Sequence, residues 1–332
     1  MGNHRDDWIE RIRLLLERAG FYVADTHGIR PSSFDLAARR DATLLLVKVL
    51  KNIDALDADE ARRLQELGGL FPAVVLVVGR SSGVSDLESG VVYTRYGVPI
   101  ISEETLTDFL EKGLAPYLYA SPGGTFAPVD GDRLRTLRIS RGLSLGTLAG
   151  IAGVSRRAIQ LYEDGAGAEV TIVERIETCL GEPIVRAIPI FELADAEEAE
   201  PPAGRRSRRP TSGPAEHERS FVPSGDPWRD GVLGQLDQMG LEVTVTTRAP
   251  FDALGRTPDI LLAALGSLRT ALHRAEVLQG LARVAEGHAL FVVRERVHRP
   301  SIGGLPILND SELKRHRDPD ELLDEITERE SP

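Results

Sequence analysis

Two apolar runs restrict the fold of this chain more than any other feature of its sequence. Residues 43–50 and 72–78 are almost entirely apolar, and an amphipathic segment at 57–67 separates them. A strand that is apolar along its whole length has both faces buried, as in a parallel sheet covered by helices. The pattern predicts an α/β fold for residues 1–118. Further strands are expected at 21–23, 34–38 and 97–101.

Composition limits the class of protein. A chain of 332 residues is long enough for two or three domains, and 42% hydrophobic residues suffice for several cores. The net charge of −11 argues against a protein that coats nucleic acid through bulk charge, although it leaves room for a local basic reader. No stretch approaches the roughly 20 apolar residues of a membrane-spanning helix, and the first residues do not form a secretion signal.

The number of cysteines limits which disulfides and metal sites are possible and which cellular compartment is expected. One cysteine, Cys179, excludes an intramolecular disulfide and a thiolate zinc site. It favours the reducing cytoplasm. The seven histidines are scattered without metal-ligand spacing, so no metal site is expected.

The chain is expected to have four further parts after residue 118. Residues 119–130 are rich in Ser, Pro and Gly and indicate a linker, and residues 131–185 indicate a helical unit. The segment 192–225 is of low complexity and is expected to be disordered. Its Arg205–Arg209 cluster is either an arm for the DNA backbone or a solvated linker. Residues 226–330 again alternate between helix and strand.

The C-terminal segment looks like a shortened, degenerate copy of the N-terminal one. Both begin with an amphipathic helix followed by glycine and a strand, and both end with a Gly-x-Pro strand before a capped helix. The matching features are Trp8–Gly20 with Trp228–Gly240, Asp35 with Asp259, and Gly97–Ile101 with Gly304–Leu308.

The helical unit carries the strongest functional signal. Helices are expected at 132–141, 145–151, 156–164 and 170–180, with Ser144 and Ser155 as caps and Gly153 in a tight turn. Two short helices joined through a glycine, the second capped and beginning with arginines, are typical of a helix-turn-helix.

This unit resembles the lambda-repressor-like XRE helix-turn-helix family. The resemblance covers about 55 residues; it rests on Leu134–Arg138, Gly142–Ala149, Gly153–Ile159 and Tyr162–Gly165. It implies an all-α domain whose third helix reads the major groove. One departure concerns Leu145, which stands where the family often has a glutamine that helps to hold phosphate.

Helical geometry selects the residues that would contact DNA. With Ile159 and Tyr162 packed inward, Arg156, Arg157 and Leu161 lie on the outward face. Arginine can bind guanine O6 and N7 together, and leucine can contact a thymine methyl group. The predicted DNA-contacting residues are Ser144, Ser155, Arg156, Arg157, Gln160 and Leu161, with Gln160 the weaker candidate. Residues 131–165 contain six arginines and three acids. The alternative is that both arginines belong to an ordinary solvated face.

The N-terminal segment raises the question of whether the protein is a nuclease. Asp35 opens one strand and Leu46-Val47-Lys48 lies on the next, which is similar to the restriction-endonuclease-like PD-(D/E)xK fold. That fold needs an acid where Leu46 stands, and Glu10 by itself cannot replace this ligand for Mg²⁺. We therefore expect a nuclease-like domain without catalytic residues, metal or cofactor.

Taken together, the order of segments resembles archaeal helix-turn-helix transcriptional regulators in which an XRE module lies between a nuclease-like domain and a C-terminal domain. The expected function is sequence-specific binding of double-stranded DNA by a cytoplasmic homodimer that is not an enzyme. The flanking α/β domains would provide dimerisation, effector sensing or protein contacts, and no membrane is involved. Two alternatives remain: a metal-dependent nuclease targeted by the helix-turn-helix, and a non-catalytic adaptor that binds partners through its acidic flanks.

Overall fold

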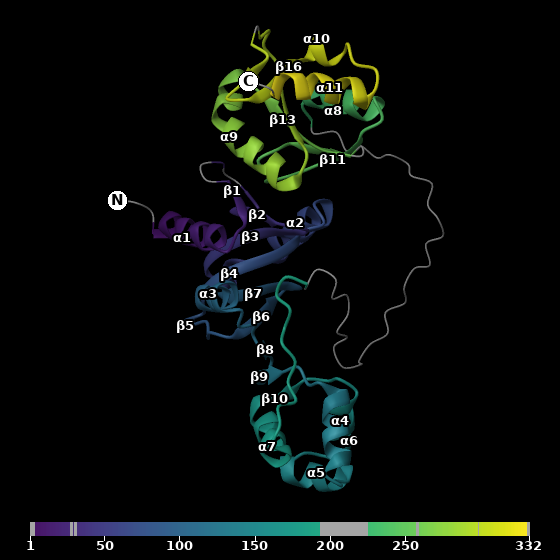
Figure 1. The fold of residues 1–332 in the computed structure, drawn as a ribbon. Helices are drawn as coiled ribbons and strands as arrows, with labels where there is room; N and C mark the ends of the chain where they lie inside the picture. Colours follow the sequence, from purple (N-terminus) through teal and green to yellow (C-terminus); the bar gives the residue numbers. More distant parts are fainter. Residues whose placement is uncertain are drawn as a thin grey trace. The chain divides into compact units, whose positions relative to one another are not determined.

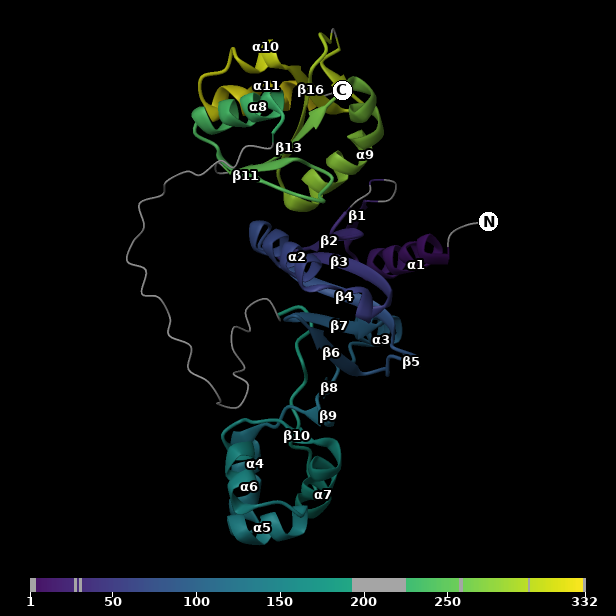
Figure 2. The same cartoon turned by 180° about the vertical axis from the view of Figure 1, so that it is seen from behind.

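The computed structural model describes residues 4–26, 29, 32–192, 225–256, 259–297 and 299–330. Contacts divide the chain into two compact units. The first comprises Met1–Phe21, Leu45–Gly69 and Ala73–Leu193; the second comprises Tyr22–Leu44, Leu70–Pro72 and Ala194–Pro332. Figures 1 and 2 show the elements from opposite sides. The expected linker at 192–225, including Arg205–Arg209, lies outside the described residues apart from its two ends. No helix in the described ranges is long and apolar enough to cross a membrane.

The N-terminal fold is built around parallel strands, as the apolar runs predict. Its helical elements are α1 (His4–Arg18), η1 (Ile53–Ala55), α2 (Ala58–Leu70) and α3 (Glu103–Lys112). Its strands from residue 43 onward are β3 (Thr43–Asn52), β4 (Val74–Ser82), β5 (Ser85–Asp86), β6 (Val91–Arg95) and β7 (Val98–Ser102). β4 pairs in parallel with both β3 and β7, and β6 pairs antiparallel with β7. Ser102 caps α3, as expected, by accepting from the Thr105 amide at 3.1 Å.

The segment 119–130 is not the linker expected from its composition. It contributes to β8 (Leu118–Ser121) and β9 (Gly124–Ala127), an antiparallel hairpin in which β8 also pairs with β6. Gly123 and Gly124 have φ angles of 104° and 141°, which residues other than glycine rarely adopt. The glycines therefore mark a hairpin turn rather than a flexible connection.

Four helices follow the hairpin: α4 (Gly131–Ser140), α5 (Leu145–Ala152), α6 (Arg156–Glu163) and α7 (Val170–Leu180). They do not form the purely helical domain expected from the sequence. A short strand, β10 (Ala168–Glu169), pairs with β9, and Ala127 and Ala168 belong to the same core cluster as the helices. Four such short helices bury little apolar surface alone, and the strands complete their core.

The second unit contains the C-terminal fold and the hairpin of β1 (Tyr22–Asp25) and β2 (Leu36–Arg40). The C-terminal helices are α8 (Pro227–Gln238), α9 (Leu268–Ala285), α10 (Asp310–Leu313) and α11 (Pro319–Glu330). Its strands are β11 (Glu242–Val245), β12 (Ala253–Arg256), β13 (Ile260–Gly266), β14 (His288–Val293), β15 (Ser301–Ile302) and β16 (Leu305–Asn309). They are ordered β11-β12-β13-β14-β16-β15.

The C-terminal fold repeats the strand pairing of the N-terminal fold. β14 pairs in parallel with β13 and β16, as β4 does with β3 and β7, and β15 pairs antiparallel with β16, as β6 does with β7. The two hairpins also share a register of four pairs. Tyr22 faces Arg39 as Glu242 faces Arg256.

The hairpins share side-chain hydrogen bonds too. The Thr26 hydroxyl donates to the Phe34 carbonyl at 2.9 Å, and the Thr246 hydroxyl donates to the Phe251 carbonyl at 2.8 Å. The residue after each phenylalanine is an aspartate, Asp35 or Asp252, directly before β2 or β12. Asp252, rather than Asp259, is therefore the counterpart of Asp35, and the match made from the sequence is wrong at this point.

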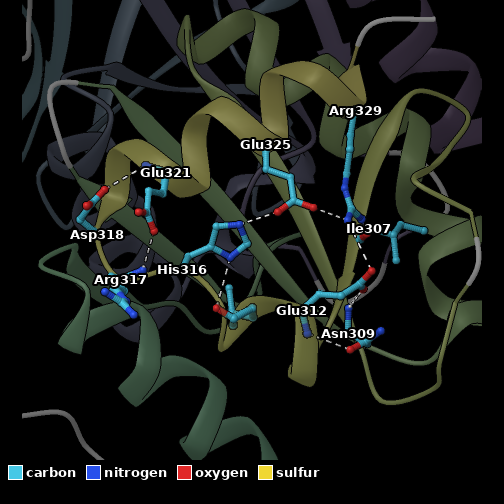
Figure 3. A network of polar contacts seen from close by, with 10 residues as sticks. Ile307, Asn309, Glu312, His316, Arg317, Asp318, Glu321, Glu325 and Arg329 are labelled. Atoms are coloured by element: carbon cyan, nitrogen blue, oxygen red, sulfur yellow. Dashed lines mark hydrogen bonds and ion pairs between the residues drawn. The ribbon is translucent and has the colours of Figure 1, made fainter.

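A polar network fastens α11 to the rest of the C-terminal fold (Figure 3). Arg329 donates to the Ile307 carbonyl of β16 and pairs with Glu312 and Glu325. The buried side chain of His316 lies with Nε2 at 2.5 Å from Glu325 Oε2. Because Arg329 contacts Ile307 and Glu312, and Glu325 contacts His316, the network orients α11 against the sheet.

Candidate nucleic-acid interface

The junction of α5 and α6 depends on one glycine. Gly153 ends α5 with a φ of 74°, in the left-handed region. A Cβ atom there would also come within 3.0 Å of Arg175 Nη1, which donates to the Ala152 carbonyl at 3.2 Å. The turn therefore requires glycine, as the sequence predicted.

Serine caps define where α5 and α6 begin. The Ser144 hydroxyl accepts from the Thr147 amide at 3.0 Å, and the Ser155 hydroxyl accepts from the Ala158 amide at 3.1 Å. Both residues are exposed. Each cap leaves amide groups of the first turn directed outward, where they suit an anion such as phosphate.

α6 presents a polar face and one exposed apolar side chain. Arg156, Arg157 and Gln160 are exposed, and Leu161 is 48% exposed, whereas Ile159 is fully buried. Neither arginine forms an ion pair with any described residue. The structure thus brings five of the predicted residues, Ser155 included, to one helix, and Ser144 lies at the start of the preceding helix.

A buried ion pair fixes the opposite face of α6. Arg138 of α4 donates to Glu163 through Nε at 2.5 Å and Nη2 at 3.1 Å, and through Nη1 to the Leu143 carbonyl at 2.9 Å. The hydrogen bonds to Glu163 raise the pKa of Arg138. A Cβ at Gly131 would lie 2.3 Å from the Glu163 carbonyl oxygen, so α4 crosses the end of α6 closely. The pair therefore holds α6 at a defined rotation.

The nuclease-like residues lie in a different part of the chain. Lys48 is buried and its Nζ lies 3.0 Å from Glu60 Oε1 on α2. Leu46, two residues earlier, is 2% exposed and supplies no ligand oxygen. Glu10 lies on the exposed face of α1, where it pairs with Arg13. Asp35 is buried in the second unit. No group of three potential metal-ligating side chains is present within the described ranges.

Relatives share nearly the whole chain. It is 36% identical over 326 residues, 97% of its length and 96% of the relative, to a "Putative HTH-type transcriptional regulatory protein" of Halorubrum lacusprofundi. Proteins with the same description from Haloquadratum walsbyi and Methanocella arvoryzae are 35% and 36% identical over 98% of this chain and 97% of each relative. The chain belongs to this family. Residues 5–116 match the PD-(D/E)XK superfamily domain. No solved structure matches the chain significantly.

Asp252, the counterpart of Asp35 in the C-terminal fold, is held by two arginines. Asp252 pairs with Arg229 of α8 and lies 3.6 Å from Arg274 of α9, and its Oδ2 accepts from the Leu265 amide at 2.7 Å. β13, the strand beside it, contains no charged residue. With its oxygens engaged by cations and an amide, Asp252 has a structural role, and the C-terminal fold lacks a lysine in the position of Lys48.

Two charged residues near these sites are missed by reasoning from the sequence. Glu60 is one acid among several in an amphipathic helix, and only its 3.0 Å approach to Lys48 distinguishes it. Glu163 occupies an inward helical position, and a charged residue at such a position is the one signal that indicates a buried partner.

Proposed function

We propose that this protein is a transcriptional regulator that binds double-stranded DNA sequence-specifically and reads the major groove with α6. The observation that carries the proposal is the exposed face of α6, where Arg156 and Arg157 have no ion-pair partner among the described residues. Arg133 and Arg138 of α4 are paired with Glu182 and Glu163. The name shared by the relatives supports DNA binding and transcription regulation.

In the proposed complex, α4–α7 act as a lambda-repressor-like XRE module. α5 crosses the DNA backbone and α6 enters the major groove. Arg156 and Arg157 bind guanine edges, Leu161 contacts a thymine methyl group, and Gln160 is suited to adenine. Ser155 and the first amides of α6, with Ser144 at the start of α5, contact phosphate and set the register.

The proposed assembly is a cytoplasmic homodimer on a palindromic site. Two copies of α6 about 34 Å apart would read successive major grooves on one side of the duplex. The α/β folds provide contacts to the second copy or to other proteins. They are not required for base recognition in this proposal.

The N-terminal fold is proposed to be catalytically inactive. Leu46 replaces the acid that would hold Mg²⁺, and the Lys48 ammonium is neutralised by Glu60. Glu60 also supports the second candidate function, a metal-dependent nuclease, because it brings a carboxylate beside Lys48. The two functions differ in whether bound DNA stays intact.

The test is selection of random duplex DNA by the full-length protein with Mg²⁺ at a fixed salt concentration, followed by a gel of the recovered DNA. An enriched motif on intact DNA supports the regulator. Cleavage that Lys48→Ala abolishes supports the nuclease. Failure to retain DNA contradicts both and favours the adaptor.

Variants separate base reading from charge. Arg157→Ala should alter the selected motif, whereas Arg269→Ala, which removes an exposed arginine from α9, should not. An unchanged motif in both variants would contradict the role of α6.

A further inference from the structure

A cavity of about 720 Å³ lies in the first unit, apart from α6. Its lining includes Lys51 from the end of β3, Arg80 from β4 and Glu103, which directly follows β7. These three strands run in parallel, so the cavity is at their carboxyl ends. Ligands of open α/β folds bind at this edge because successive strands deliver loops and helix starts there.

Trp8 of α1 forms part of the cavity wall. The residue is 7% exposed and lines the cavity. Its indole Nε1 is buried and forms no hydrogen bond with any part of the chain that the structure describes. Because Nε1 itself has no accessible surface, Trp8 contributes part of its ring to the cavity wall, and the charged side chains of the lining would bind the polar groups of a ligand.

Two cations of the lining lack ion-pair partners. Three of the four lysines, Lys48, Lys112 and Lys314, pair with carboxylates at 2.6–3.0 Å. Lys51 forms no ion pair with a described residue, and neither does Arg80. Two cations without ion-pair partners in the lining of one cavity fit an oxyanion, a carboxylate or a phosphate group.

The acidic residues of the lining limit the negative charge that the bound anion can carry. Arg11 is engaged by Glu103 through two hydrogen bonds of 3.1 and 3.2 Å. Asp86 and Glu104 also line the cavity and form no ion pair within the described ranges. They would repel a polyanion such as the DNA backbone and would accept hydrogen bonds from amino groups of a small ligand.

We propose that this cavity binds a small molecule that carries one oxyanion and at least one amino group. Lys51 and Arg80 hold the oxyanion, Asp86 and Glu104 hold the amino group, and Trp8 forms part of the cavity wall. α-Amino acids and nucleoside monophosphates with an exocyclic amine both present this combination, through a carboxylate and a phosphate respectively.

Trp8 makes the proposal directly measurable. The chain has two tryptophans, and Trp228→Phe leaves Trp8 as the single tryptophan, whose emission can be excited selectively. The full-length Trp228→Phe protein is titrated with the standard amino acids, with AMP, GMP and CMP, and with inorganic phosphate. A saturable change in emission with amino acids identifies a carboxylate ligand, and one with nucleotides identifies a phosphate ligand.

Charge variants decide whether the change comes from the proposed site. Lys51→Ala and Arg80→Ala should each weaken binding at least tenfold, and Lys112→Ala, which removes a paired lysine of α3, should leave it unchanged. Arg157→Ala should also leave it unchanged, so that failure of the DNA-binding proposal is distinguishable. The proposal is overturned if no compound binds at millimolar concentration, if inorganic phosphate alone binds, or if binding survives loss of both Lys51 and Arg80.

Discussion

Arg39 and Arg256 occupy equivalent positions in the two hairpins, and each donates to a backbone carbonyl near the end of a helix of the other fold. Arg39 of β2 donates to Val284 of α9, and Arg256 of β12 donates to Leu70, the last residue of α2. Phe71 and Phe251 pack edge to face beside them, with centroids 5.7 Å apart. Two equivalent hydrogen bonds, one from each hairpin, therefore help to hold the second unit together.

Loss of either arginine should destabilise the second unit. Arg39→Ala and Arg256→Ala each leave a helix carbonyl without its donor and should lower the free energy of unfolding by about 1–3 kcal/mol. Urea denaturation of the full chain measures the effect. Arg62→Ala, which removes an exposed arginine paired within α2, should cost less than about 0.5 kcal/mol. Equal costs for all three variants would contradict the role of the reciprocal bonds.

On its preferred DNA site, Arg157→Ala should lose about 1–3 kcal/mol of binding free energy and tolerate more sequences at one position. Fluorescence anisotropy with the selected duplex and with single-base variants measures both effects. A uniform loss on all duplexes would show that Arg157 contacts only phosphate.

Gly153→Val should disrupt the turn between α5 and α6. Its φ of 74° costs a β-branched residue about 1–3 kcal/mol, and the new side chain meets Arg175. Gly150→Ala is the matched control, because no neighbour lies within 4 Å of its Cβ position and alanine favours a helix. Thermal unfolding should separate the two variants, and a Gly153→Val protein as stable as Gly150→Ala would refute the turn assignment.

Removal of Arg138 should be more costly than removal of Arg133. Arg138→Ala leaves the Glu163 carboxylate buried, with only Arg135 at 3.8 Å, and should cost about 3–5 kcal/mol. The Arg133–Glu182 pair is half exposed and should contribute less than about 1 kcal/mol. Chemical denaturation followed by circular dichroism tests this ranking, and an equal loss of stability in the two variants would contradict it.

Alkaline pH should destabilise the helical segment through Tyr162. Burial raises the pKa of its hydroxyl, and Glu169 adds to the shift. The contribution to stability is complete below the unfolded pKa of about 10 and is lost as pH rises through the folded pKa. Tyr162→Phe should therefore flatten the decline in urea midpoint above about pH 10, and Tyr96→Phe, an exposed tyrosine, should not. A decline that Tyr162→Phe leaves unchanged would assign it to other groups.

Local features of the fold are predictable from the sequence because they depend on neighbouring residues. The apolar runs of β3 and β4 and the caps at Ser102, Ser144 and Ser155 are where the sequence places them. Residues 119–130 are wrongly predicted to be a linker because a pair of glycines fits a linker and a hairpin turn equally well. Only pairing with β6 distinguishes the two.

The candidate sites also combine features that follow from neighbouring residues with features that depend on distant parts of the chain. Exposure of Arg156 and Arg157 follows from helical periodicity once Ile159 is inward. The match of Asp35 to Asp259 fails because the loops before β2 and β12 differ in length, and strand register is set by partners distant in the chain.

By itself, the sequence determines the helix starts, the buried strands, the turn at Gly153 and the outward arginines of α6, since these depend on propensity, capping and periodicity within a few residues. The tertiary structure decides which distant groups meet: Glu60 with Lys48, Glu163 with Arg138, and Asp252 with its arginines. It also decides that Lys51, Arg80 and Trp8 line one cavity. Such encounters depend on the packing of elements far apart in the chain, for which no local pattern in the sequence carries a signal.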